Sequence, residues 1–243
     1  MDRFKAVTSY DGNDFFGFQI QAQGRTVQGE IEKALHQIAK VPIRIVGAGR
    51  TDTGVHAVGQ VIAFNLHWNH STQALQRALN VYLPVDIVIS HLEKVQAIFH
   101  PRFDAISRQY RYTIINQTVR SALAWRYTTH IPHKLNVESM KQATSYLLGT
   151  HDFASFGKPP QGDNTVRTVI QTEWRTNGDI ITFDITANAF LYRMVRSIVG
   201  TLLQVGLNKI DVESVNTILM ATNRAMAKQT ARASGLCLVK VNY

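Results

Sequence analysis

The chain of 243 residues contains one cysteine, Cys237, so an internal disulfide and a zinc site built from cysteines are excluded. No apolar run reaches the roughly 20 residues that a membrane-spanning helix needs, and the first residues do not form a basic and then apolar signal peptide. Low-complexity tracts and proline-rich linkers are also missing. We therefore expect a folded cytoplasmic protein with no membrane partner, in which Cys237 is a buried thiol.

Acidic residues are fewer than basic ones. There are 17 Asp and Glu against 26 Lys and Arg, which gives a net charge of +9 and a pI near 9.8. Because Lys and Arg neutralise phosphates and release counterions, this excess favours a nucleic-acid partner. A basic surface that binds nothing is the alternative.

The first part of the chain, residues 1–98, has the pattern of an α+β lobe. Alternating and helical periodicities predict the order strand, helix, strand, strand, helix, strand, which is typical of a ferredoxin-like unit. Thr26 and Ser71 or Thr72 are the expected helix caps. The predicted strands are 4–10, 42–46, 58–64 and 86–92, and the predicted helices are 28–40 and 72–82.

The second part, residues 99–243, predicts another α+β lobe. Tyr110 and Tyr112 alternate with Arg111 along one strand, and Asn177-Gly178 is a strong hairpin signal. We expect a cleft between the two lobes. The predicted strands are 109–115, 168–176, 180–187 and 236–241, and the predicted helices are 136–148, roughly 190–206 and 211–221.

The loop 47–56 is the strongest candidate for chemistry. Its three glycines permit tight backbone geometry, and they alternate with Arg50, Asp52 and, at the end, His56. A cation beside a carboxylate favours the ionised form that a nucleophile requires. The alternative is structural, since Asp in a glycine-rich segment commonly forms a turn or a cap.

Other motifs for cofactors or metals are weak. There is no GxGxxG sequence before a helix and no phosphate-binding GK[ST] sequence. His67 and His70 flank a tryptophan without a carboxylate nearby, and the other histidines are scattered. We predict neither metal nor cofactor.

Basic and aromatic residues of the second part could contact RNA. Arg193 and Arg196 are three residues apart and are expected to share a face of the long helix, either toward a cleft or toward solvent. Tyr110 lies among arginines and could stack on a base or belong to the core. The remaining candidates are Arg102, Arg108 and the segment from Lys158 to Arg167, which is expected to be a mobile basic loop or an ordinary hairpin loop.

Short motifs follow one another along nearly the whole chain. They are Tyr10-Asp11-Gly12, Gly17-Phe18-Gln19, Arg25-Thr26-Val27-Gln28, residues 49–57, Leu79-Asn80, Leu83-Pro84, Asp86-Ile87, residues 99–103, residues 108–112, residues 149–153, residues 165–168, residues 187–191, Met194-Val195-Arg196, and Gly235-Leu236-Cys237-Leu238 followed by Val241 and Tyr243.

In this order the motifs resemble the tRNA pseudouridine synthase A family. The resemblance implies two α+β lobes joined through an extended, mainly antiparallel sheet, with the catalytic cleft between them. It also implies a cofactor-free homodimer that isomerises uridines 38 to 40 in the anticodon stem-loop of tRNA.

The resemblance also assigns roles to single residues. It implies that Asp52 is the catalytic carboxylate, Tyr110 the tyrosine that stacks on the target base, and Arg196 the arginine paired with the carboxylate. Leu236 would pack beneath the base, and Arg50 would hold the vacated base position or a phosphate.

One position departs from the family pattern, because Arg232 stands where the family commonly has proline. Losing the fixed φ of proline is expected to loosen the loop before Leu236. A non-catalytic RNA-binding protein or RNA chaperone is the alternative function. A metal-dependent nuclease is a more distant one, since the 17 acids form no evident paired cluster.

Overall fold

The computed structural model describes residues 1–159, 162–227 and 229–243. These residues form two compact units, one of Met1–Ile106 with Cys237–Tyr243 and one of Ser107–Leu236. The domain division between residues 98 and 99 stays a prediction. Among the described residues, no helix combines the length and the apolar character needed to cross a membrane.

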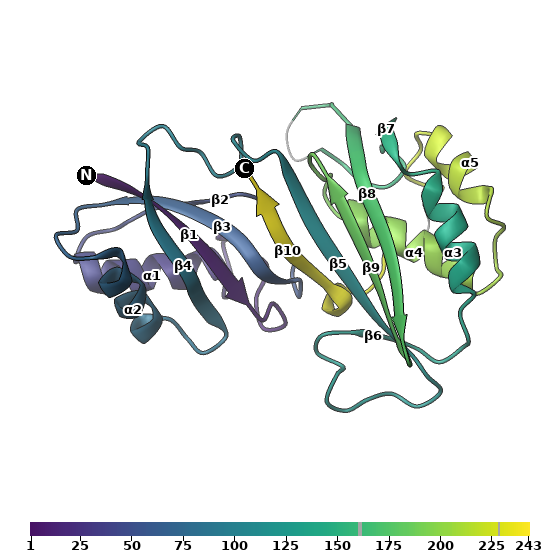
Figure 1. Cartoon of the computed structure of the whole chain (residues 1–243), viewed down its shortest axis with the longest axis horizontal. Coiled ribbons are helices and arrows are strands. Elements are labelled where there is room, and N and C mark those ends of the chain that lie inside the picture. Colours follow the sequence, from purple (N-terminus) through teal and green to yellow (C-terminus); the bar gives the residue numbers. More distant parts are fainter. Residues whose placement is uncertain (160–161, 228) are drawn as a thin grey trace. The chain divides into compact units, whose positions relative to one another are not determined.

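The first unit confirms the predicted order of strands and helices (Figure 1). Its sheet has the order β4-β1-β3, and both β2 and β10 pair with β3. All pairings within this unit are antiparallel except that of β10 with β3, which is parallel. The elements are β1 (Asp2–Tyr10), α1 (Val27–Ala39), β2 (Ile45–Gly47), β3 (His56–Leu66), α2 (Thr72–Tyr82), β4 (Ile87–Val95) and β10 (Leu236–Asn242).

Local chemistry explains where its helices begin and end. The hydroxyl of Thr26 accepts a hydrogen bond from the Gly29 amide at the start of α1, and Ser71 caps α2 in the same way. Lys40 ends α1 in a left-handed conformation with φ 58°. The apolar faces of both helices are buried, and β1 alternates between buried and half-buried residues, so the core lies between helices and sheet.

The second unit is also α+β (Figure 1). Its sheet has the order β5-β9-β8-β7 with antiparallel pairs, and β6 pairs in parallel with β5. The predicted α+β class with mixed sheet pairing is thus confirmed. The elements are β5 (Ser107–Asn116), β6 (Thr129–Ile131), α3 (Val137–Ser145), β7 (Gly149–Asp152), β8 (Val166–Asn177), β9 (Ile180–Ala187), α4 (Met194–Gly206), α5 (Ser214–Met220) and the 3-10 turn η1 (Ala233–Gly235).

Several details of the second unit differ from the expectations. The hairpin at Asn177-Gly178 is confirmed, with Gly178 at φ 57°. The long helix, however, begins at Met194 because Arg193 is left-handed with φ 61°. Arg193 is therefore the N-cap residue of α4. The prediction that Arg193 and Arg196 share a face of the helix is wrong. The strands β6 and β7 were not predicted, since three or four residues are too few to show alternation.

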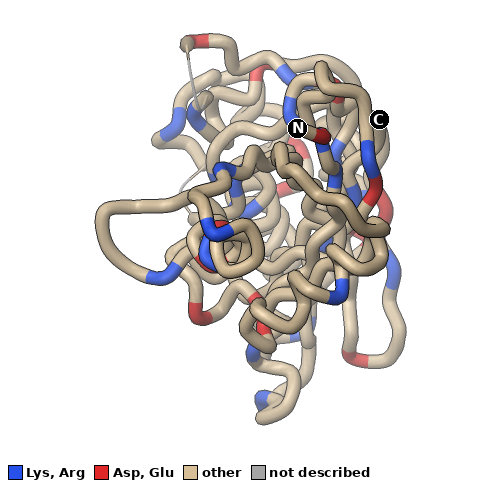
Figure 2. Tube along the Cα trace, turned by 90° about the vertical axis from the view of Figure 1, so that its left-hand side faces the viewer, with Lys and Arg blue, Asp and Glu red and all other residues tan. Residues whose placement is uncertain are grey.

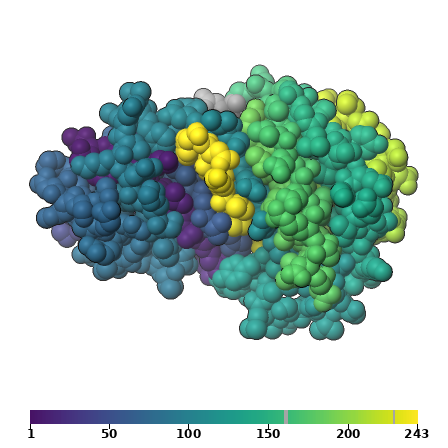
Figure 3. Space-filling view, viewed as in Figure 1, coloured from purple at the N-terminus to yellow at the C-terminus, as the bar shows by residue number. Residues whose placement is uncertain are grey.

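Cys237 differs from the sequence expectation too. Its side chain is half-buried rather than buried, and its thiol lies 3.7 Å from the Leu238 carbonyl oxygen. In Figure 3 the C-terminal residues, in yellow, reach the surface.

Candidate active site

Asp52 lies on a turn between β2 and β3. The Val55 amide donates to the Asp52 carbonyl oxygen at 3.1 Å, and Gly54 has φ 78°, so Asp52 is the first residue of a four-residue β-turn. Its side chain is half-buried. The structural and the catalytic interpretations of this segment are therefore compatible, since a rigid turn presents the carboxylate.

The last residue of β1, Tyr10, and the segment that follows it, residues 11–18, hold this turn in place. The Tyr10 hydroxyl and the Thr51 hydroxyl form a buried hydrogen bond of 2.8 Å. The Phe18 amide donates to the Thr51 carbonyl oxygen at 3.1 Å, and the Gly54 amide donates to Phe15 at 3.4 Å. Thr51 and Gly54, which lie on either side of Asp52, are thus tied to a segment about forty residues earlier in the chain.

Two glycines make this close approach possible. A Cβ atom on Gly12 would lie 2.0 Å from the Val55 carbonyl oxygen, and one on Gly17 would lie 2.8 Å from that of Thr51. Gly17 also has φ 92°, a conformation that other residues rarely adopt. Any side chain at either position would push the two segments apart.

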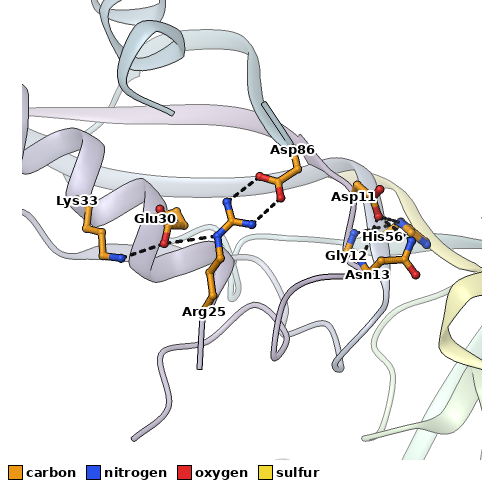
Figure 4. Close-up of polar contacts among 8 residues, drawn as sticks. All are labelled: Asp11, Gly12, Asn13, Arg25, Glu30, Lys33, His56 and Asp86. Carbon is orange, nitrogen blue, oxygen red and sulfur yellow. Dashed lines mark hydrogen bonds and ion pairs between the residues drawn. The ribbon is translucent and has the colours of Figure 1, made fainter. Parts of the chain in front are cut away.

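Two polar side chains of β3 fix the backbone around the loop. Gln60 is fully buried, and its amide donates to the Gly49 carbonyl oxygen at 2.8 Å. His56 is also buried, and its Nδ1 accepts a hydrogen bond of 3.0 Å from the Gly12 amide (Figure 4). The side-chain nitrogen of Gln60 and Nδ1 of His56 thereby obtain the partners that burial demands.

His56 Nδ1 also lies 3.3 Å from an Asp11 carboxylate oxygen. An ion pair there would need a proton on Nδ1, whereas the Gly12 amide needs a lone pair on the same nitrogen. The amide hydrogen has a direction fixed by the backbone, so we assign Nδ1 as the acceptor. The Asp11 oxygen instead accepts hydrogen bonds from the backbone and side-chain nitrogens of Asn13.

Arg25 lies farther along the chain, at the end of residues 11–25, which connect β1 to the N-cap of α1 (Figure 4). Its guanidinium forms two hydrogen bonds with the Asp86 carboxylate, at 2.6 and 2.9 Å, and lies 4.3 Å from the Phe15 ring centroid. The hydrogen bond with Asp86 raises the pKa of Arg25 above its usual value. The role of residues 11–25 in supporting the Asp52 turn was not predicted. The motifs that contain Gly12, Gly17 and Arg25 were the sequence feature that could have indicated it.

In the second unit, Tyr110 and Tyr112 lie on the same face of β5, as predicted. Tyr110 is half-buried, and its ring meets that of Phe190 edge-on at 5.1 Å. Tyr112 is fully buried, its hydroxyl donates to the Arg232 carbonyl oxygen at 2.8 Å, and the Thr129 hydroxyl lies 2.5 Å from it. Burial raises the pKa of Tyr112 to about 12, although the hydrogen bond with Thr129 lowers it in part.

Arg196 anchors the segment that leads to Leu236. Its Nε donates to the Ala231 carbonyl oxygen at 2.8 Å, and the Ala231 amide donates back to the Arg196 carbonyl oxygen at 2.9 Å. Arg232 follows with φ −57°, within the range that proline imposes. The backbone at Arg232 is therefore compatible with proline, and the expected loosening of the loop stays a prediction. Leu236 begins β10 and is buried.

The basic residues named from the sequence occupy different surroundings. Lys158 and Arg193 both contact Tyr192. The Lys158 carbonyl oxygen accepts a hydrogen bond of 2.8 Å from the Tyr192 amide, and the Arg193 guanidinium lies 4.9 Å from the Tyr192 ring centroid. Arg108 donates to the Asn188 carbonyl oxygen at 2.8 Å. Arg111, on the opposite face of β5 from Tyr110, forms an ion pair of 2.8 Å with buried Asp184.

The other basic candidates lie elsewhere. Arg50 is exposed, and Arg102 has its guanidinium 5.6 Å from the Phe103 ring centroid. Arg167 donates to the carbonyl oxygens of Asn164 and Val166, and burial lowers its pKa. The expected loop from Lys158 to Arg167 includes residues 160 and 161, which lie outside the described residues. Figure 2 shows Lys and Arg spread along the trace among acidic residues rather than in one run.

The chain is similar to known proteins along its whole length. The family model described as tRNA pseudouridine synthase matches residues 6–104 and 143–243. A protein named tRNA pseudouridine synthase A from Geobacillus sp. is 42% identical over 243 residues, covering 99% of this chain and 98% of the relative. Relatives with the same name from Brevibacillus brevis and Leuconostoc mesenteroides are 44% and 40% identical, each covering 100% of both chains.

Proposed function

Because the chain belongs to the tRNA pseudouridine synthase A family, we propose that it isomerises uridine to pseudouridine in tRNA with Asp52 as the catalytic carboxylate. The observation that supports this role is the turn at Asp52. It is held by backbone hydrogen bonds and by two glycine contacts that permit no side chain. Such preorganisation is what a catalytic group requires. The alternative of a non-catalytic RNA-binding protein is not favoured, since the full-length relatives are named as synthases.

The reaction needs no redox partner and no group donor. In uridine, ribose C1′ is bonded to N1 of uracil, and in pseudouridine it is bonded to C5. The C1′–N1 bond breaks, the C1′–C5 bond forms, and the hydrogen that leaves C5 is balanced by the one gained at N1. Substrate and product are therefore isomers, and the protein has to supply positioning, charge and proton transfer. Asp52 promotes glycosidic cleavage, and the freed base then turns so that C5 faces C1′.

Three further residues complete the proposed machinery. The half-buried Tyr110, whose ring is held edge-on by Phe190, stacks on the target uracil. Arg196 supplies positive charge to the reaction, and Leu236 packs beneath the base. The roles of Arg196 and Leu236 are supported by the two hydrogen bonds that join Arg196 to Ala231, in the segment that leads to Leu236.

The proposed substrate is the anticodon stem-loop, with uridines 38 to 40 as targets and a homodimer in the cytoplasm as the acting species. A base inside a stem has to leave the stack, which costs a few kcal/mol. Stacking on Tyr110 and contacts of phosphates with basic residues would offset this cost. The proposed contacts are Arg50, Arg102, Arg108, Lys158, Arg167 and Arg193.

The proposal is tested by incubating purified protein with an unmodified tRNA transcript, in EDTA and without nucleotides, and by mapping pseudouridine at every uridine. We expect product at positions 38 to 40 only. Product at other positions would refute the assigned targets, and strand cleavage or no product with intact binding would refute the activity. The dimer is tested separately by sedimentation.

A further inference from the structure

The imidazole of His56 is buried beside the catalytic turn, yet the proposed reaction gives it no task. His56 is the first residue of β3 and follows the turn Asp52-Thr53-Gly54-Val55 directly. Its Nδ1 accepts the Gly12 amide, from a segment that is 44 residues away in sequence. This hydrogen bond joins the end of the catalytic turn to the segment that supports it (Figure 4).

Two backbone hydrogen bonds connect Gly12 with the turn. The Phe15 amide donates to the Gly12 carbonyl oxygen at 3.1 Å, and the Phe15 carbonyl oxygen accepts the Gly54 amide. Gly54 is two residues after Asp52. These three hydrogen bonds and the backbone from Gly54 to His56 therefore form a closed circuit at the end of the turn. The only side-chain atom in these bonds is Nδ1 of His56.

We propose that His56 is a positioning residue that fixes the Asp52 turn by accepting the Gly12 amide. This inference rests on the proposed function, because it assigns His56 to the same reaction. What matters is an acceptor at the position of Nδ1. A side chain of similar size without an acceptor would leave the buried Gly12 amide unsatisfied, and the two segments would separate there. A shift of about 1 Å in a catalytic group can cost about 10²-fold in rate.

The test compares three variants. His56→Leu removes the acceptor, His56→Asn places an amide oxygen near the position of Nδ1, and His56→Gln places it near Nε2. We expect His56→Leu and His56→Gln to lower kcat by about 10- to 100-fold while KM for tRNA changes by less than about threefold. His56→Asn should keep most of the wild-type kcat. His91→Leu, which removes an exposed imidazole of β4, is the matched control and should match the wild type.

Hydrogen exchange at the Gly12 amide gives a second readout that does not depend on activity. Protection should fall in His56→Leu and be retained in His56→Asn. Equal kcat for the Asn and Gln variants, or a loss expressed in KM alone, would overturn the proposal, and so would unchanged Gly12 protection in His56→Leu. If the wild-type protein makes no pseudouridine, the proposed function fails, and the exchange data still decide whether His56 holds Gly12.

Discussion

Replacing Tyr112 by phenylalanine removes one hydroxyl group from the core of the second unit. The hydroxyl donates to the Arg232 carbonyl oxygen and lies within hydrogen-bond distance of the Thr129 hydroxyl, and the ring is fully buried. A Cβ atom on Gly235 would lie 2.7 Å from this ring, so the side chain also shapes the turn before Leu236. Tyr112→Phe would leave the Arg232 carbonyl oxygen and the Thr129 hydroxyl without this partner, so we expect it to lower the free energy of unfolding by about 1–3 kcal/mol at neutral pH.

The cost should depend on pH in a defined direction. Burial raises the pKa of Tyr112 from 10.0 to about 12, so the folded state keeps the proton that the unfolded chain loses above pH 10. Below pH 10 both states are protonated and the hydroxyl's contribution to stability is complete. As pH rises through this window the unfolded state binds fewer protons, and stability is lost. With about 1.4 kcal/mol for each pH unit, the loss between pH 10 and 12 is about 2 kcal/mol.

The assay is denaturant unfolding of the wild type and of Tyr112→Phe at pH 9, 10, 11 and 12. Other tyrosines and lysines titrate in both proteins, so the difference between the two curves isolates this hydroxyl. We expect the advantage of the wild type to shrink by about 2 kcal/mol between pH 10 and 12. A difference that stays constant over this range would refute the reasoning.

Three further predictions concern Gly17, Tyr110 and Arg232. Gly17→Ala should cost about 2 kcal/mol or more in unfolding free energy and should lower kcat. Gly178→Ala, also at positive φ but in open space, should cost about 1 kcal/mol and leave kcat unchanged. Equal effects of the two substitutions would contradict the contact of Gly17 with the Asp52 turn. Tyr110→Ala should weaken tRNA binding by about 1–3 kcal/mol and Tyr110→Phe should not; equal losses in titrations would point away from stacking. Arg232→Pro should raise the unfolding free energy by about 0.4–1 kcal/mol, because φ is already suitable; a lower melting temperature would contradict this.

The parts of the fold that were predicted well depend on local signals. Thr26 and Ser71 cap helices through their own hydroxyls, and Asn177-Gly178 forms its turn within two residues. The start of the long helix was placed too early because Leu191 continues the apolar stripe. Arg193 is left-handed and the helix starts after it, and apolar periodicity does not record the φ of a single residue.

The candidate site shows the same division between local and distant information. The glycine-rich segment around Asp52 identifies a turn with a carboxylate from the residues alone. That Gly12, Gly17 and His56 hold this turn depends on pairing between segments about forty residues apart, which one sequence does not specify. The family resemblance supplies residue roles, but the hydrogen-bond circuit around the turn comes only from the structure.

The most direct test of the account is the single-turnover rate of pseudouridine formation by Asp52→Asn on an unmodified tRNA transcript, compared with the wild type under saturating protein. Asparagine keeps the size of the side chain and the backbone of the turn, so folding and tRNA binding should be retained. We expect a rate at least about 10³-fold lower. A rate within about tenfold of the wild type, with binding intact, would show that the carboxylate of Asp52 is not the catalytic group.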